Sequence, residues 1–135
     1  SLSGDYHMSW FTNGDLNQGI YYARYSFDDE RSADIFKVDG QPGAGHPFLS
    51  EHNGKLHLVW KGFNGRETLL NLITSEDDGA TWSESTTLLK TEKGSDHPSL
   101  IQNSDSLFLS WHTDEFGYIL LDISENAPRL SNNGN

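Results

Sequence analysis

The 135-residue chain contains no cysteine, only four prolines, and only nine lysine and arginine residues against twenty acidic ones. Without thiols it holds neither a disulfide framework nor a thiolate metal site. A formal charge of −11 repels phosphate backbones and anionic lipids, which argues against nucleic acid or a membrane surface as a partner. Its apolar runs stay far below the roughly 20 residues of a membrane helix, so we expect no membrane insertion.

Hydrophobic residues make up 34% of the chain and aromatic residues 12%, which is enough to bury a core. The length fits a single domain. We therefore expect one folded unit rather than a disordered segment.

Three segments share a pattern of alternating residues that ends in tryptophan: Tyr6–Trp10, Leu56–Trp60 and Leu107–Trp111. Their tryptophans lie 50 and 51 positions apart. A second marker, the dipeptide His-Pro, recurs with the same step at His46 and His97. Two independent markers with one period of about fifty residues indicate a repeat protein.

Within the second repeat, strand-like runs alternate with turn signals. Asn53-Gly54 and Asp78-Gly79 are typical turn pairs, because Asn, Asp and Gly accept the positive φ angles that tight hairpins need. No helical period of comparable length competes. We predict four short strands in this repeat, at 46–50, 55–61, 67–74 and 84–89.

One face of the second of these strands carries Leu56, Leu58 and Trp60, and such a face must be buried. The equivalent faces carry Tyr6, Met8 and Trp10 in the first repeat and Leu107, Leu109 and Trp111 in the third. A four-stranded unit cannot bury both of its faces alone, and radial stacking of such units gives a β-propeller. The predicted fold class is therefore all-β, a partial propeller of about three four-stranded antiparallel blades. Its units lie at about 1–44, 45–95 and 96–131, with a disordered tail at 132–135.

The turn from Ser75 to Trp82 reads Ser-Glu-Asp-Asp-Gly-Ala-Thr-Trp. Ser75 and Asp77 are suited to accept hydrogen bonds from turn amides, and Gly79 supplies a conformation closed to other residues. Thr81 and Trp82 re-enter the sheet, where Trp82 caps the hydrophobic layer. The segment resembles the Ser-x-Asp-x-Gly-x-Thr-Trp motif, the Asp-box or BNR repeat, of sialidase-like β-propellers.

This resemblance implies a six-bladed ring of about fifty residues a blade, of which the chain holds roughly half. It also implies that the Asp-box is structural, since in the family it lies on the face opposite the active site, and that the protein is periplasmic or secreted. Open blades at both ends would expose apolar faces and strand edges. We therefore expect the chain either to self-associate or to belong to a longer propeller chain.

Connections that enter the first strand of a blade, and those that follow each tryptophan, share the face on which propellers bind ligands. Residues expected there are His46, His97, Asp96, Arg66, Glu67 and His112. The repeated His-Pro is more typical of a recurring strand start than of a proton shuttle. Two histidines with one aspartate could ligate zinc, but the repeat accounts for them without a metal, so we predict no metal and no cofactor. The in-phase tryptophans are more typical of core packing than of a sugar-stacking platform.

As the resemblance implies, a sialidase needs three arginines for the substrate carboxylate, a tyrosine nucleophile assisted by glutamate, and an aspartate as acid or base. Of the four arginines only Arg66 falls on the ligand face, and Tyr118 near Glu115 is the one candidate nucleophile. A glycosidase of another type needs two carboxyl groups flanking the bond, for which Asp96 with Glu67 or Glu115 is available.

One arginine instead of three favours a non-catalytic role, in which the propeller recognises a glycan, a peptide or a protein at the channel mouth or serves as a scaffold. The alternative is a part of an exo-sialidase-type glycoside hydrolase whose remaining catalytic residues lie outside this chain. Arg66, Asp96, Glu115 and Tyr118 are then the catalytic candidates.

Overall fold

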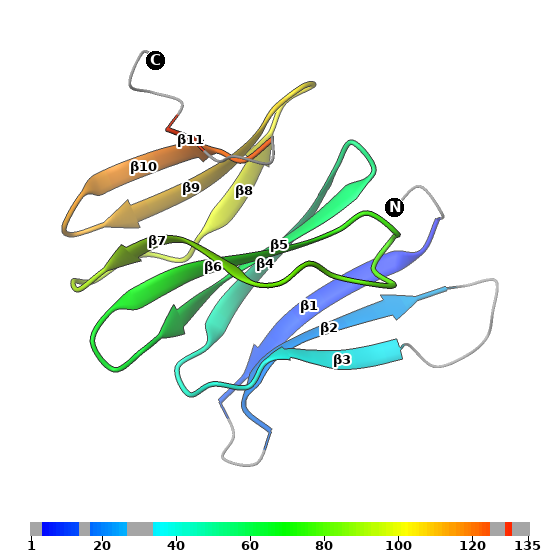
Figure 1. Ribbon diagram of the computed structural model, residues 1–135, viewed down its shortest axis with the longest axis horizontal. Helices are drawn as coiled ribbons and strands as arrows, with labels where there is room; N and C mark the ends of the chain where they lie inside the picture. Colours follow the sequence, from blue (N-terminus) through cyan, green and yellow to red (C-terminus); the bar gives the residue numbers. More distant parts are fainter. Residues whose placement is uncertain (1–3, 14–16, 27–33, 125–128, 131–135) are drawn as a thin grey trace.

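The computed structural model describes residues 4–13, 17–26, 34–124 and 129–130. All regular secondary structure in these residues is β-strand. These strands form three antiparallel sheets that follow one another in chain order across the molecule (Figure 1). Among the described residues there is no helix of the length and apolarity needed to span a membrane. The all-β fold class is confirmed.

Each sheet is a meander in which consecutive strands pair. The first sheet contains β1 (Tyr6–Thr12), β2 (Gly19–Tyr25) and β3 (Asp34–Asp39). The middle sheet contains β4 (Gly45–His52), β5 (Lys55–Phe63), β6 (Thr68–Ser75) and β7 (Thr86–Thr91). The last sheet contains β8 (Ser99–Gln102), β9 (Leu107–Thr113), β10 (Gly117–Asp122) and β11 (Arg129–Leu130). The middle sheet matches the four predicted strands, with ends that differ by no more than two residues.

The β4–β5 hairpin shows how local sequence sets these ends. His52 pairs with Lys55, so the turn consists of Asn53 and Gly54 alone. Their φ angles are 52° and 76°, and two positive φ angles define the type I′ turn that suits the twist of paired strands.

Side chains of β5 point alternately to the two neighbouring sheets. Leu58 and Trp60 pack with Ile20 of β2 between the first and middle sheets. Val59 packs with Trp111 of β9 between the middle and last sheets. We call the face that carries the tryptophan of each repeat the leading face of its sheet, and the opposite face the trailing face. Leading faces pack on the trailing face of the preceding sheet, which is the arrangement of a partial β-propeller.

The leading face of the first sheet departs from the expectation that all three tryptophan-ended segments are buried. Leu58 and Leu109 are fully buried, whereas Met8 at the equivalent position is 44% exposed and Tyr6 is 60% exposed. Trp10 is half-buried. The expectation was wrong for Tyr6 and Met8 because, within the described residues, no sheet precedes β1 to supply an apolar layer.

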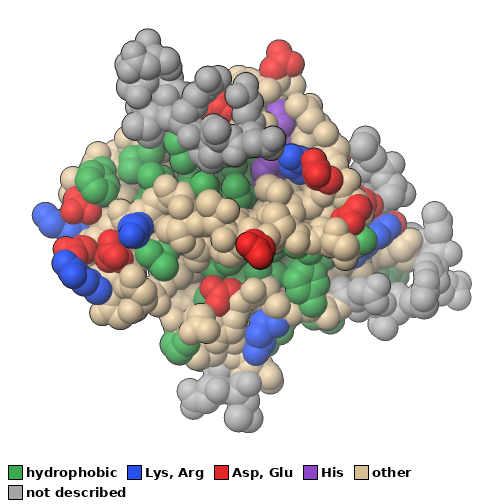
Figure 2. Space-filling view, viewed as in Figure 1, with side chains coloured by type: hydrophobic (Ala, Val, Ile, Leu, Met, Phe, Trp, Pro, Cys, Tyr) green, Lys and Arg blue, Asp and Glu red, His purple; other side chains and the backbone are tan. Residues whose placement is uncertain are grey.

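Charged side chains are dispersed over the visible face of the molecule (Figure 2). On the side shown in Figure 2, acidic and basic groups are interspersed around the edge, and hydrophobic groups emerge between them. No patch of one charge sign gathers there among the described residues.

Candidate functional site

An open hollow of about 450 Å³ lies where the three sheets meet. Strand β4 contacts both β1 and β8 there, so the starts of the two His-Pro strands lie close to the first sheet. The described residues that line the hollow are Ser9, Trp10, Phe11, His46, Pro47, Phe48, His97 and Pro98. Side chains of the first sheet, of the middle sheet and of the segment that enters the last sheet thus converge on the hollow.

The two repeated histidines are stacked on each other in this hollow. Their ring centroids are 3.6 Å apart and the ring planes differ by 15°. Phe11 also contacts His46, with ring centroids 4.7 Å apart and ring planes that differ by 54°. Gly45 permits this close packing, because a Cβ atom there would lie 3.3 Å from a ring carbon of Phe11.

The backbone at His46 is unusual. Its φ angle is 53°, and the β4–β5 register is irregular between Gly45 and Phe48. A non-glycine residue in the left-handed region carries strain, and such strain is concentrated at binding and catalytic sites. At His46 the positive φ angle accompanies the irregular start of β4.

The surroundings of His46 favour its uncharged form. Burial lowers the pKa of His46, and the neighbouring His97 and Lys61 lower it further. Neutral imidazole offers one hydrogen-bond donor and one acceptor. Lys61 donates a hydrogen bond from Nζ to the backbone oxygen of Ser95 over 3.1 Å, and burial lowers its pKa while Asp96 raises it. The hollow thus combines the neutral imidazole of His46 with the apolar surfaces of phenylalanine and proline.

Two buried tryptophans hold the loops that lead into the His-Pro strands. Trp60 Nε1 donates a hydrogen bond to Asp39 Oδ2 over 2.8 Å, seven residues before His46. Trp111 Nε1 donates to the backbone oxygen of Asp96, directly before His97, also over 2.8 Å. The repeated tryptophan therefore positions the repeated histidine, which gives the two sequence markers a common physical reason.

Of the six ligand-face residues expected from the sequence, His46 and His97 line the hollow. Asp96 lies beside it, exposed, and its amide donates a hydrogen bond to the backbone oxygen of His112 over 2.9 Å. His112 is exposed near the end of β9 and does not line the hollow.

Arg66 and Glu67 lie at the β5–β6 connection, away from the hollow. The Arg66 guanidinium forms an ion pair with Glu92. The backbone amide of Glu67 donates a hydrogen bond to Asn64 Oδ1 over 2.7 Å. Both residues take part in local contacts of the connection.

Glu115 and Tyr118 belong to the β9–β10 hairpin. Glu115 Oε1 accepts a hydrogen bond from Thr91 Oγ1 over 2.9 Å, which joins the middle and last sheets. The Tyr118 hydroxyl accepts one from Ser110 Oγ over 2.9 Å on the same sheet. None of the four catalytic candidates is among the described residues that line the hollow.

Sequence reasoning placed the segments after each tryptophan, which begin at Phe11, Lys61 and His112, on the ligand face, but it did not include Phe11 or Lys61 among the six candidate residues. Each directly follows a tryptophan of the repeat, as His112 does in the third repeat. The repeat itself therefore indicates that residues at this position lie near the ligand face.

The turn after β6 is closed by its own side chains. Ser75 Oγ accepts a hydrogen bond from the amide of Gly79 over 2.9 Å, and Asp77 Oδ1 accepts one from the amide of Thr81 over 2.8 Å. The Thr81 hydroxyl donates to Asp77 Oδ2 over 2.5 Å. Hydrogen bonds from Thr81 and Ser75 lower the pKa of Asp77 to about 2. The carboxylate is thus occupied within the turn.

This turn also contacts the first sheet through a group of polar side chains. His7 Nε2 lies 3.2 Å from Asp78 Oδ1, and His7 Nδ1 lies 2.7 Å from the Tyr22 hydroxyl. Arg24 pairs with Asp5 at 2.5 Å and with Asp78 at 3.6 Å. Burial raises the pKa of Tyr22 to about 12, so its hydroxyl stays protonated. The group links the middle sheet to the first.

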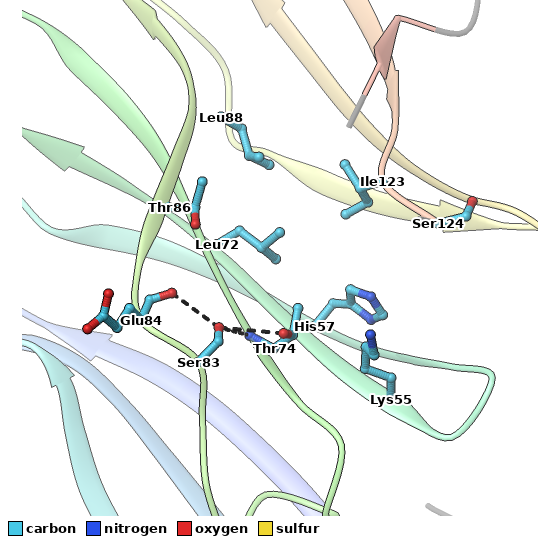
Figure 3. A pocket seen from close by; sticks show the side chains of 10 residues that line it. All are labelled: Lys55, His57, Leu72, Thr74, Ser83, Glu84, Thr86, Leu88, Ile123 and Ser124. Carbon is cyan, nitrogen blue, oxygen red and sulfur yellow. Dashed lines mark hydrogen bonds between the residues drawn. The ribbon is translucent and has the colours of Figure 1, made fainter. Parts of the chain in front are cut away.

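A second, smaller cavity of about 210 Å³ lies between the middle and last sheets (Figure 3). Leu72, Leu88 and Ile123 form its apolar side. His57 is buried beside it, and its Nδ1 has no hydrogen-bond partner among the described residues. Burial, with a contribution from Lys55, lowers the pKa of His57 to about 4, so a neutral imidazole is enclosed between the two sheets.

Comparison with known proteins identifies a structural neighbour but no family. No family model matches the chain, and no curated protein matches it. A solved structure of the Cellvibrio cellulosa alpha-L-arabinanase complexed with arabinohexaose is similar, with a TM-score of 0.60 and 16% sequence identity. The likeness covers 94% of this chain and 53% of the arabinanase chain, so this chain spans about half the length of its neighbour. At this identity the likeness shows the propeller fold alone.

Proposed function

We propose that this partial propeller is a non-catalytic recognition domain that binds a neutral glycan in the hollow between its three sheets. The observation that carries the proposal is the stacked pair His46 and His97, which lines an open hollow together with Phe11 and two prolines. The volume of about 450 Å³ falls within the roughly 300–1,000 Å³ of ordinary ligand pockets.

The chemistry of the lining suits a sugar without charge. The C–H face of a pyranose or furanose ring packs on aromatic and proline surfaces, here Phe11 and Pro47, while its hydroxyl groups exchange hydrogen bonds with imidazole nitrogens. Acidic sugars are disfavoured because the protein carries a net charge of −11. The structural neighbour was solved with arabinohexaose, an uncharged oligosaccharide, which supports the same ligand class.

Binding without hydrolysis is favoured by what the lining contains. Glycoside hydrolysis uses two carboxyl groups on either side of the scissile bond. The described residues that line the hollow include no aspartate and no glutamate. Arg66, the arginine expected to hold an acidic substrate, is paired with Glu92 at the β5–β6 connection.

Isothermal titration calorimetry with arabinohexaose, and with xylose- and glucose-based hexasaccharides for comparison, tests the proposal. We expect His97→Ala and Phe11→Ala each to weaken binding by at least about tenfold, which is about 1.4 kcal/mol. Phe63→Ala is the matched control, since Phe63 is an exposed aromatic residue outside the hollow, and should leave affinity unchanged. Absence of binding to every oligosaccharide, or equal losses in all three variants, would overturn the proposal.

A hydrolase is the second candidate, favoured by one observation: the structural neighbour is an arabinanase. Asp96, directly before His97, is the carboxylate nearest in sequence to the hollow. Release of reducing ends from arabinan by the purified chain, abolished by Asp96→Asn, would replace recognition with catalysis. Unchanged oligosaccharide after prolonged incubation supports recognition.

A further inference from the structure

The first sheet carries an apolar leading face that the described chain leaves open. Met8 occupies the position of Leu58 and Leu109, which are both fully buried under a neighbouring sheet, yet Met8 is 44% exposed. Ile35 of β3 lies on the same face, since it pairs with Ala23 and Ala23 pairs with Met8, and it is 60% exposed. The same surface is thus covered in two repeats and exposed in the third.

The last sheet carries the opposite surface, an open trailing face. Tyr118 pairs with His112, the residue after Trp111, just as Leu70 pairs with Lys61, the residue after Trp60. Leu70 is fully buried against the last sheet, whereas Tyr118 is 57% exposed. Ile101 of β8, on the same face through its pairing with Phe108, is 48% exposed.

These two faces are the two halves of an interface that the chain forms twice within itself. In the interior, a trailing face packs on the next leading face, with Val59 and Leu70 on one side and Leu109 and Trp111 on the other. One open face of each kind remains, at opposite ends of the row of sheets (Figure 1). A second copy of the chain brings both complementary surfaces at once.

We infer that two copies of this chain associate head to tail, with the trailing face of each last sheet packed on the leading face of the other copy's first sheet. Two such contacts close a ring with two-fold symmetry and cover all four open faces. Exposed apolar sheet faces of this kind are otherwise a liability for aggregation. The length of the structural neighbour agrees with this, since one copy spans 53% of that propeller chain.

One open face is a leading face and the other is a trailing face, so each can be altered separately by substitution. In a head-to-tail ring, a lysine at Met8 and a lysine at Tyr118 each damage both contacts of a homodimer. When the two variants are mixed, the intact trailing face of M8K meets the intact leading face of Y118K. The mixed dimer therefore has one contact between unaltered faces, while both lysines lie in the other contact.

Light scattering and sedimentation equilibrium over a concentration series give the test, with a monomer of 15.1 kDa. We expect the unchanged chain to reach twice this mass and no more, M8K and Y118K each to remain monomeric, and their equimolar mixture to form a heterodimer. Ile35→Lys repeats the M8K test at a second exposed position, and circular dichroism shows that each variant is folded. Phe63→Lys, an exposed aromatic residue of the middle sheet, should dimerise normally.

A monomer at every concentration overturns the inference, and the open faces then await sheets of a longer polypeptide. Masses above the dimer overturn the closed ring. Loss of the dimer in M8K with full retention in Y118K indicates leading face against leading face and likewise overturns it. The variants leave His46, His97 and Phe11 untouched, so glycan binding and self-association succeed or fail separately.

Discussion

Replacement of Gly79 by alanine should strongly destabilise the protein, because two separate requirements meet at this residue. Its φ angle is 90°, in the region that L-residues enter at a cost of about 1–2 kcal/mol. A Cβ atom there would overlap the Tyr22 hydroxyl and lie 2.8 Å from Cζ of the same ring. Overpacking of this kind costs about 1–3 kcal/mol. The expected loss of unfolding free energy is therefore about 2–5 kcal/mol.

The steric part is large because the Tyr22 ring has nowhere to move. Tyr22 is 1% exposed, its hydroxyl lies 2.7 Å from His7 Nδ1, and its ring meets the edge of Trp82 at a centroid distance of 5.0 Å. A shift of the ring would break the contact with His7 and loosen the packing of Trp82. The substitution should thus weaken the link between the first and middle sheets as well as the turn.

Gly65 offers a matched control. Its φ angle is 96°, close to that of Gly79, but no atom lies within 4 Å of the place where a Cβ would be. Gly65→Ala should therefore cost only the backbone part, about 1–2 kcal/mol. Urea unfolding followed by tryptophan fluorescence measures both variants, and a loss of 1 kcal/mol corresponds to about 3–5 °C in Tm for a chain of this size.

A double-mutant cycle separates the two contributions further. Tyr22→Phe removes the overlapping oxygen, so the added cost of Gly79→Ala should be smaller in that background than in the unchanged protein. Equal costs for Gly79→Ala and Gly65→Ala would refute the reasoning, since they would mean that the ring of Tyr22 yields freely.

Four other outcomes follow from the same contacts. Because folding lowers the pKa of His57 from 6.5 to about 4, the unfolded state binds the proton more tightly. The free energy of unfolding should therefore have its full value above pH 6.5 and fall by at most about 3 kcal/mol towards pH 4. Urea titrations should show that this pH dependence is flatter in His57→Gln. Because folding raises the pKa of Tyr22 to about 12, stability should fall as the pH rises from 10 to 12, and ultraviolet difference absorbance should show one tyrosine that ionises late. Trp60→Phe removes the indole N–H that donates a hydrogen bond to Asp39, so thermal unfolding should show a loss of about 1–3 kcal/mol in the free energy of unfolding. It should also weaken glycan binding, because the loop before His46 is no longer held. Glycan affinity should persist to a pH below 6.5 and drop once His46 is protonated, which a calorimetric pH series checks; a midpoint above 6.5 would contradict the role of its burial.

Local patterns were sufficient to predict the elements of the middle sheet. Asn53-Gly54 specifies a two-residue turn through its own φ preferences, and the alternation of Leu56, Leu58 and Trp60 specifies which face of β5 is apolar. Both properties depend on residues adjacent in the chain. The fifty-residue period then extended the prediction from one sheet to three.

Prediction of the hollow was only partly possible. The period placed His46 and His97 at equivalent strand starts, but their stacking at 3.6 Å depends on how two sheets meet. Arg66 was expected to face a ligand and instead pairs with Glu92, whose proximity depends on the packing of β5 and β7 ends. The direction in which a long polar side chain points depends on partners that are distant in the sequence, and the pattern of residues along the chain does not reveal these partners.

The amino-acid sequence by itself determined that this chain is built of repeated, two-faced β-sheets, because turn propensity and side-chain alternation act over a few neighbouring residues. Tertiary structure alone decided which of the equivalent faces are covered. Met8, Leu58 and Leu109 occupy the same position in their repeats. Leu58 and Leu109 are buried because another sheet packs on them, whereas Met8 is exposed because no other sheet among the described residues covers it. Burial is a property of what lies opposite a side chain, and that is set by packing between segments far apart in the chain.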